Sequence, residues 1–145
     1  MDAQEPMRLV VLDTNVVMSA GIKPGSAPAT LLMDWVLEGQ VQAVTCPAVV
    51  REYRNVMHRS KFTRYSFPSL WLEFLIDDSM HLNDPPKWPH PGPHADGLIF
   101  LALAHASGAW LVTGNLRHFP EKARHGVAVI SPAEYLAHLE PSSKR

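Results

Sequence analysis

The amino-acid sequence predicts an α/β protein with a three-layer α/β/α arrangement, in which helices cover a central parallel sheet. Two observations carry this prediction. Short apolar runs alternate along the chain with longer segments of helical spacing, as in parallel sheets with crossover helices. The chain also has 145 residues, of which 46% are hydrophobic, enough for one globular domain over residues 1–145. We expect its core at residues 8–139 and a flexible tail at residues 140–145.

The N-terminal part begins with an expected buried strand over residues 8–12, a continuous apolar run rich in valine. The stretch KPGSAP then interrupts the apolar pattern with turn-forming residues. Ser26 in that stretch can cap a helix over residues 29–39, because its hydroxyl can accept a hydrogen bond from a first-turn N–H group. Gly39 is expected to end this helix.

The middle of the chain continues the alternation. A second strand is expected over residues 41–46, and Pro47 suits the first turn of a helix over residues 47–59. A further helix is expected over residues 68–78. Five prolines between residues 84 and 93 exclude regular structure there, so we expect a stiff loop within the same domain.

The C-terminal part repeats the pattern. A helix is expected over residues 94–108, followed by a strand that runs into a turn over residues 109–115. After a loop with one helical turn, VAVI at residues 127–130 is the next expected strand. Ser131 is placed to cap a last helix over residues 132–140.

Two polar side chains follow predicted strands. Asp13 comes directly after the run RLVVL, and Asn115 ends the stretch AWLVTGN. Ligand sites of parallel sheets lie at the carboxyl ends of the strands, so we expect these two residues to belong together. A buried carboxylate is too costly to keep without a partner, so Asp13 in particular requires an explanation.

Two further acids are attached to apolar helix faces. Glu52 lies at the margin of the apolar stripe of the helix that begins at Pro47, and Asp96 opens a helix with Phe100 one turn later on the same face. Three carboxylates that converge repel one another, and a divalent cation removes that cost. Oxygen ligands without a cysteine or histidine cluster indicate Mg²⁺ or Mn²⁺ rather than Zn²⁺.

Each acid also has an ordinary structural explanation. Asp13 can cap the loop or helix that follows its strand. Asp96 can interact with the dipole of its helix start. Glu52, which stands beside Arg51, can belong to a half-buried ion pair. Only the convergence of three inward acids favours a metal site.

The overall composition constrains function weakly. A net charge of −1 and a pI near 6.7 do not indicate a generally basic nucleic-acid binder, so any attraction for phosphates must be local. The single cysteine, Cys46, excludes an internal disulfide and fits a reducing cytoplasm. The opening MDAQEPM lacks the basic region of a signal peptide, so we expect a soluble cytoplasmic protein without membrane contact.

Four segments of the chain carry a resemblance to a known family. LDTNVVMSA joins a strand to a first acid, and CPAVVREYRNVMHRSKF is a helix with a second acid. HADGLIFLALAHASGAWLVTGNLRHFP holds a third acid and the strand that follows it, and VISPAEYL holds a last strand and helix. In this order and with these gaps they resemble the PIN domain, a family of metal-dependent nucleases that includes the VapC-like toxins of bacterial toxin–antitoxin pairs. The resemblance spans residues 8–139.

The resemblance implies that Asp13, Glu52 and Asp96 are the catalytic acids and bind Mg²⁺ or Mn²⁺. Asn115, a weaker candidate ligand, stands where many family members have a fourth aspartate. His118 stands where the most similar branch commonly has an acid. These departures lower the negative charge of the site, and one Mg²⁺ on three acids remains sufficient to polarise a phosphate and activate water.

Further expectations concern the surroundings of the acids. Thr14, Asn15 and Thr113 are expected to steady Asp13 through hydrogen bonds, with His118 beside them, and ordinary turn chemistry is the alternative. The resemblance also implies a single-stranded RNA substrate cleaved by phosphodiester hydrolysis, a small antitoxin encoded nearby, and a homodimer.

A local basic segment is the candidate RNA-binding surface. Between residues 51 and 64, basic side chains outnumber the single acid, and interleaved aromatic rings offer faces for unpaired bases. The candidate RNA-binding residues are Arg51, Arg54, Arg59, Lys61, Phe62 and Arg64. The alternative is a solvated helix end whose arginines cover apolar surface.

Two other functions remain open from the sequence. A PIN scaffold that no longer cuts and works as a binding module is suggested by Asn115 and His118, although the three acids are intact. A phosphotransferase similar to haloacid dehalogenases would use Asp13 as a nucleophile. It is disfavoured because Asn15 replaces the second aspartate of the Asp-x-Asp opening that those enzymes share.

Overall fold

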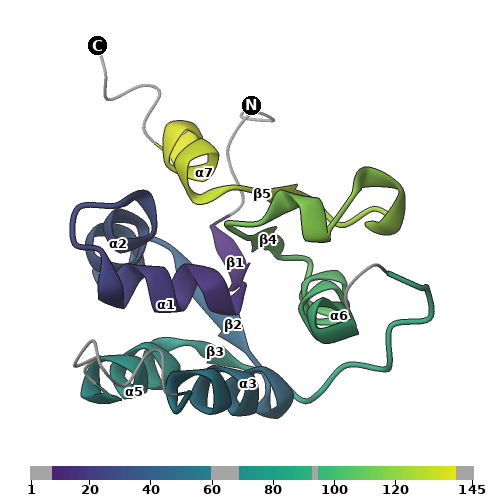
Figure 1. The fold of residues 1–145 in the computed structure, drawn as a ribbon, viewed down its shortest axis with the longest axis horizontal. Helices are drawn as coiled ribbons and strands as arrows, with labels where there is room; N and C mark the ends of the chain where they lie inside the picture. Colours follow the sequence, from purple (N-terminus) through teal and green to yellow (C-terminus); the bar gives the residue numbers. More distant parts are fainter. Residues whose placement is uncertain (1–7, 60–68, 93–94, 140–145) are drawn as a thin grey trace.

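A parallel sheet forms the centre of the protein. The structure is a computed structural model that describes residues 8–59, 69–92 and 95–139. Within these ranges, five strands pair in parallel in the order β3-β2-β1-β4-β5 (Figure 1). They are β1 (Leu9–Leu12), β2 (Gln42–Thr45), β3 (Met80–His81), β4 (Trp110–Val112) and β5 (Val129–Ile130).

Helices cover the sheet on both sides. Helix α6 packs on β1, β2 and β4, whereas α1 and α2 lie on the other side of β1 (Figure 1). The helices are α1 (Thr14–Ile22), α2 (Ala27–Thr30), the π-helical η1 (Leu31–Val36), α3 (Pro47–Met57), α5 (Ser69–Asp78), α6 (Leu98–Ser107) and α7 (Pro132–Leu139). Short 3-10 turns are η2 (Ala95–Gly97), η3 (Leu116–His118) and η4 (Glu121–Ala123). This arrangement confirms the three-layer α/β/α fold predicted from the sequence.

The helix starts expected from capping residues and from Pro47 agree with the structure, whereas the helical segment expected to end at Gly39 ends at Val36. The Ser26 hydroxyl accepts a hydrogen bond from the Ala29 N–H group at 3.3 Å, and Pro47 lies in the first turn of α3. The Ser131 hydroxyl accepts from the Glu134 N–H group at 3.2 Å at the start of α7. None of the helices in the described ranges combines the length and the apolar character that a membrane crossing requires.

Two elements were not predicted from the sequence. Helix α1 begins directly after Asp13, and its sequence TNVVMSAGI has no polar face that would reveal a helical period. Strand β3 consists of two exposed residues, too few to form an alternating pattern.

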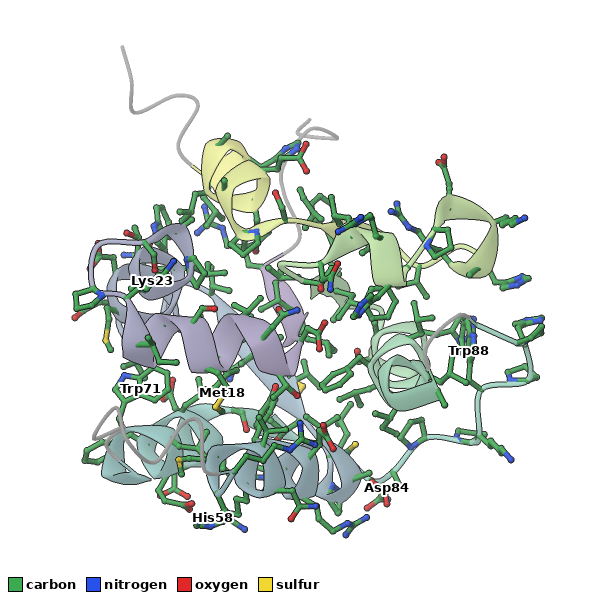
Figure 2. All side chains as sticks on the ribbon, in the orientation of Figure 1. Met18, Lys23, His58, Trp71, Asp84 and Trp88 are labelled. Carbon is green, nitrogen blue, oxygen red and sulfur yellow. The ribbon has the colours of Figure 1, made fainter. Side chains whose placement is uncertain are left out.

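The proline-rich segment is irregular between Asp84 and Gly92, as expected, and Pro93 lies outside the described residues. Trp88 anchors this segment on the side of α6 that faces away from α1 (Figure 2). Its ring is buried and meets the His105 ring of α6 edge-on, with centroids 5.6 Å apart. An aromatic side chain buried in this way fixes the path of the chain ahead of η2.

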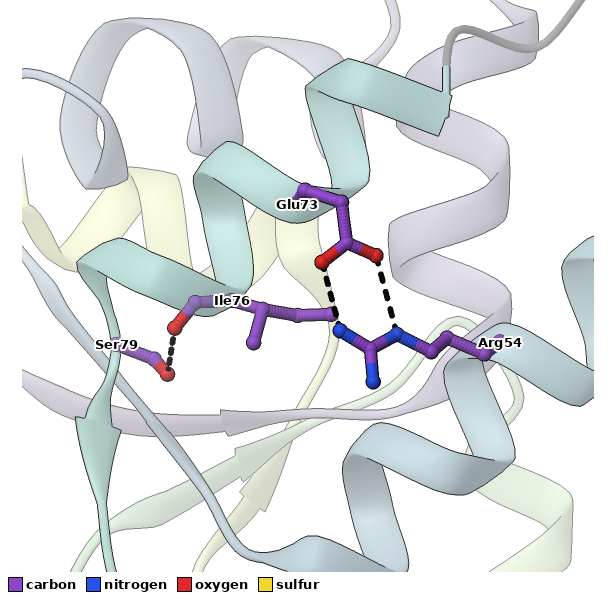
Figure 3. Close-up of polar contacts among 4 residues, drawn as sticks. All are labelled: Arg54, Glu73, Ile76 and Ser79. Atoms are coloured by element: carbon purple, nitrogen blue, oxygen red, sulfur yellow. Dashed lines mark hydrogen bonds and ion pairs between the residues drawn. The ribbon is translucent and has the colours of Figure 1, made fainter.

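Helix α3 bonds to the loop at Asp84 through its first turn and to α5 through its last turn. The Asp84 carboxylate accepts a hydrogen bond from the Ala48 N–H group at 2.9 Å, which satisfies one of the free donors of the helix start. Figure 2 shows Asp84 at this end of α3. Farther along, the Arg54 guanidinium forms a two-bond ion pair with the Glu73 carboxylate of α5, at 2.6 and 3.0 Å (Figure 3). Both side chains are exposed, so this pair contributes at most about 1 kcal/mol.

Replacement of Gly108 by alanine is expected to destabilise the protein by about 1 kcal/mol. Gly108 ends α6 in the left-handed region, with φ +77, and its N–H group donates to the Ala104 carbonyl at 2.9 Å. An added Cβ would meet no atom within 4 Å, so the cost is purely conformational. Urea unfolding should show a lower midpoint for Gly108→Ala and a smaller loss for Gly108→Asn. Equal midpoints for wild type and the alanine variant would contradict this account.

Candidate functional site: a pocket at the carboxyl edge of the sheet

The pocket lies where the strand order of the sheet reverses. The chain continues from β1 to β2 and β3 on one side, and β4 and β5 then fill the other side. Ligands of open parallel sheets bind at this kind of reversal, beyond the carboxyl ends of the strands. Leu12 pairs with Val112 in the β1–β4 register, so the next residues, Asp13 and Thr113, are brought to the same place.

A cavity of about 410 Å³ opens at this edge. Its walls come from α1, α3, η2, α6 and η3. Seven residues singled out from the sequence line it, namely Asp13, Thr14, Asn15, Glu52, Arg59, Asn115 and His118. The rest of the lining is largely apolar and includes Met18, which lies between α1 and α3 (Figure 2). The fold therefore gathers side chains that lie about a hundred residues apart in the chain.

The Asp13 carboxylate is held by a hydrogen bond to each of its oxygens. Oδ1 accepts from the Thr14 N–H group at 2.7 Å, and Oδ2 accepts from the Thr113 hydroxyl at 2.7 Å. The Asp13 side chain thus caps α1 while the Asp13 N–H group donates to the Val112 carbonyl at 2.9 Å. These bonds fix the carboxylate relative to both β1 and β4.

The electrostatic environment of Asp13 is unfavourable to its charge. Asp13 is 8% exposed, and burial raises the pKa of its carboxyl group, against the lowering effects of the Thr113 and Thr14 hydrogen bonds and of the nearby His118. Within the described ranges Asp13 forms no ion pair. A buried carboxylate without a cationic partner is costly, and a divalent cation is the kind of group that removes this cost.

Three neighbours link the ends of β1 and β4. The Asn15 side-chain oxygen accepts from the Gly114 N–H group at 3.0 Å, and the Thr113 hydroxyl accepts from the Asn115 N–H group at 3.0 Å. Thr113 contacts Asp13 directly through its hydroxyl, whereas Asn15 bonds to the turn that follows β4. Thr14 supports Asp13 through its backbone rather than its hydroxyl, which is buried and makes no hydrogen bond among the described residues.

The Asn115 side chain also bonds to His118. Its Nδ2 atom lies 2.8 Å from His118 Nε2, so the side-chain oxygen of Asn115 is left for other contacts. Both side chains are half-buried at the pocket. The two departures from the family pattern therefore lie side by side.

The other two acids differ in what is described of them. Glu52 is half-buried on α3 and lines the pocket. The backbone of Asp96 lies in η2, next to the pocket-lining Gly97, and its side chain lies outside the described part of the structure. Among the side chains that are described, no three histidine, cysteine, aspartate or glutamate residues are grouped so as to hold a metal ion.

The chemistry of the available donors fits Mg²⁺ or Mn²⁺. The carboxylates of Asp13 and Glu52 and the amide oxygen of Asn115 are hard oxygen donors. Asp13 has both oxygens oriented and its charge unpaired, as stated above, so the observed arrangement is compatible with a cation ligand.

Sequence reasoning missed the apolar wall of the pocket. Phe119 is 2% exposed and lies against Gly97, where an added Cβ would come within 2.9 Å of the Phe119 ring. Gly97 therefore leaves the space that Phe119 fills beside Asp96. The sequence shows that Gly97 directly follows Asp96. It does not indicate which aromatic ring fills the space that Gly97 leaves.

Three of the six candidate RNA-binding residues lie in the described part of the structure, and their surroundings differ. Arg59 is exposed and lines the pocket. Arg51 is exposed on α3, and Arg54 is engaged with Glu73 of α5. The remaining candidates, Lys61, Phe62 and Arg64, lie outside the described residues.

Comparison with known proteins places this geometry in a family. A family model described as "PIN domain" matches residues 9–117, whereas a comparison with curated proteins finds no match. The chain is similar in fold to VapBC2 from Rickettsia felis, solved bound to a DNA fragment from its promoter, with a TM-score of 0.60 and 15% identity over 85% of this chain and 98% of that one.

Two further solved structures show the same likeness. FitAcB from Neisseria gonorrhoeae has a TM-score of 0.55 and 21% identity over 86% of this chain and 98% of that chain. FitAB bound to a DNA fragment has a TM-score of 0.53 and 18% identity over 85% of this chain and 94% of that chain. At these identities the likeness concerns the fold alone, and the family model carries the assignment. The chain belongs to the PIN domain family, a family of nucleases.

Proposed function

We propose that this protein is a metal-dependent endonuclease that hydrolyses phosphodiester bonds in single-stranded RNA and serves as the toxin of a toxin–antitoxin pair. The observation that carries this proposal is the state of Asp13. Its carboxylate is buried, oriented by a hydrogen bond on each oxygen, and placed in a pocket that Glu52 also lines. A purely structural aspartate at this place would be expected to have a cationic partner.

The proposed ligands of Mg²⁺ or Mn²⁺ are Asp13, Glu52 and Asp96, with Asn115 as a weaker fourth. A divalent cation supplies Lewis-acid stabilisation of the charge that develops on the phosphate, and it lowers the pKa of the attacking water. Thr113 and the Thr14 N–H group hold Asp13 in position for this role. We propose that Glu52 accepts a proton from the water, a role supported by its place on α3 in the lining of the pocket that Asp13 also lines.

The proposed path of the RNA passes Arg59. This guanidinium lines the same pocket as Asp13 and Glu52, so it can neutralise a phosphate next to the acids. Arg51 is a second candidate on the exposed side of α3, and Lys61, Phe62 and Arg64 follow in the segment outside the described residues. Arg54 is a weaker RNA-binding candidate than Arg59, because Glu73 already neutralises its charge.

The proposed setting is that of related toxins. We propose a small antitoxin, encoded nearby, that blocks the pocket, and a homodimer of the toxin in the cytoplasm. The likeness in fold to VapBC2, FitAB and FitAcB supports a partnership of this kind.

The contact between Asn115 and His118 favours one alternative function. A PIN scaffold that binds nucleic acid or protein without cutting would accommodate Asn115 and His118, which bond to each other at the pocket. Membership of the PIN family argues against the phosphotransferase alternative, since a nucleophilic Asp13 is not needed there.

Substitution of the proposed acids is expected to abolish RNA cleavage. Asp13→Asn, Glu52→Gln and Asp96→Asn should each lower the rate at least about 100-fold, because each removes a ligand or a proton acceptor. The measurement is cleavage of a mixed single-stranded RNA pool with Mg²⁺ or Mn²⁺, with and without EDTA. Glu121→Gln, an exposed acid outside the pocket, is the matched control and should cut like wild type.

The outcomes separate the two functions. Metal-dependent cleavage by wild type and by Glu121→Gln, lost in the three variants, supports the nuclease. Mn²⁺ binding by wild type without cleavage of any RNA supports the binding scaffold. Cleavage that survives EDTA, or that survives in Asp13→Asn, contradicts the proposed mechanism.

Replacement of Asp13 by asparagine is expected to stabilise the metal-free protein near neutral pH. Burial raises the pKa of Asp13, so this group favours the folded state fully only below its unfolded pKa and loses that contribution as the pH rises through its folded pKa. Without metal near pH 7, Asp13→Asn should therefore melt a few degrees higher than wild type, an effect on the order of 1 kcal/mol. The difference should shrink as the pH falls through the raised pKa of the folded wild-type carboxyl group, because that group then takes up its proton.

Thermal unfolding with Mn²⁺ provides the control for this prediction. The cation should raise the melting temperature of wild type and leave that of Asp13→Asn nearly unchanged, because only the folded wild type binds it. A variant that melts below metal-free wild type across the whole pH range would show that the Asp13 charge is compensated in some other way.

Removal of Arg59 is expected to weaken RNA binding more than chemistry. Arg59→Ala should raise KM several-fold with little change in kcat, and it should lower the slope of log affinity against log salt concentration by about one. Arg54→Ala, a substitution on α3 outside the pocket lining, is the matched control, because the Arg54 charge is already paired with Glu73. Equal effects of the two substitutions would place the RNA elsewhere.

A further inference from the structure

One buried side chain on the helix of Glu52 contacts both the strand that leads into Asp13 and the helix that follows the turn of Asp96. Tyr53 follows Glu52 on α3 and is 1% exposed. Its hydroxyl donates a hydrogen bond to the Leu12 carbonyl of β1 at 2.6 Å. Its ring stacks on that of Phe100 in α6, with centroids 6.4 Å apart and an angle of 28° between the planes. Tyr53 therefore links α3, β1 and α6.

The bond to Leu12 acts on the peptide group that carries Asp13. The Leu12 carbonyl and the Asp13 N–H group belong to one rigid plane, because the peptide bond does not rotate. The Asp13 N–H group donates to the Val112 carbonyl at 2.9 Å, and the Leu12 carbonyl, which points the opposite way within the same plane, accepts from Tyr53. With both polar groups of the peptide bonded, the direction in which Asp13 leaves β1 is fixed.

The contact with Phe100 acts on the third element. Phe100 lies one helical turn after Asp96, and it lines the pocket itself. Its packing against Tyr53 sets the distance between the start of α6 and α3. The same side chain thus sets the spacing of the backbone segments that carry Asp13, Glu52 and Asp96.

The tyrosine hydroxyl is otherwise unexpected in this position. A phenylalanine ring would fill the same space, and a buried hydroxyl is unfavourable unless it is bonded. Burial, with the nearby Asp13 charge as a second cause, raises the pKa of Tyr53 well above its ordinary value, so the hydroxyl keeps its proton and remains a donor.

We propose that Tyr53 is a positioning residue of the proposed metal site, which holds the backbone of Asp13 in line with Glu52 and Asp96 through the Leu12 carbonyl. This inference rests on the proposed function. It assigns to Tyr53 a role in metal affinity that its place in the core does not by itself require.

The test compares two buried tyrosines. Tyr53→Phe removes the hydroxyl and keeps the ring. Tyr135→Phe is the matched control, because Tyr135 is also fully buried but packs against Trp110, outside the lining of the pocket, with centroids 6.0 Å apart. The measurements are calorimetric Mn²⁺ binding to the metal-free proteins, thermal unfolding, and steady-state cleavage of RNA.

The expected result separates positioning from packing. Tyr53→Phe should bind Mn²⁺ about 10-fold more weakly and cut with a lower kcat at a similar KM. Substitutions of residues that orient metal ligands without binding the metal have effects of this size. Tyr135→Phe should lose comparable thermal stability and keep the wild-type affinity for Mn²⁺. The titration is run at a temperature at which circular dichroism shows both variants to be folded, so a lower melting temperature does not disturb the comparison.

Two results overturn the inference, and they are distinguishable. If wild type binds Mn²⁺ and Tyr53→Phe binds it equally well, Tyr53 is a packing residue and the proposed function stands. If wild type neither binds Mn²⁺ nor cuts RNA, the proposed function fails and the positioning role fails with it.

Discussion

The rest of the site depends on the way that the chain leaves β1 at Asp13. At this point one residue ends a buried strand, caps a helix and presents a carboxylate to a pocket. Its backbone is bonded to β4 and its side chain to Thr14 and Thr113. Among the described residues, no ion pair neutralises the Asp13 charge. This unpaired charge is the reason for the proposal that Asp13 binds a cation.

The parallel sheet explains why a few hydrogen bonds are enough to hold Asp13 in place. Because β1 and β4 are neighbours in register, the residues that follow them need only short side chains to meet. The acid on α3 reaches the same edge because its helix is held at its start by Asp84 and along its length by Tyr53. Stability and site geometry thus share the same contacts in this part of the molecule, and residues that support the acids also belong to the core.

The sequence predicts the helices and strands that a local pattern marks. It does not predict those that form through contacts with distant segments. Apolar runs reveal β1, β2 and β4, and Ser26 and Pro47 mark helix starts. Helix α1 was not predicted, because it is buried over most of its surface and has no polar face that would mark a helical period. The gathering of Asp13, Glu52 and Asn115 at one edge follows from the order of strands and helices. The role of Tyr53 could not be foreseen, because its bond joins residues 41 positions apart.

The direct passage from β1 into α1 also bears on how such a chain can change in length. An extra residue beside Asp13 would rotate the helix by about 100° and carry the acid away from Thr113, so the cap of α1 and the bond to Thr113 would be lost together. Between Asp84 and Gly92 the chain runs without regular structure on the outer side of α6, and there a residue gained or lost away from the Asp84 and Trp88 contacts would leave the strands in place. Differences in length among relatives should therefore gather in that outer segment, and the junction at Asp13 should keep its spacing.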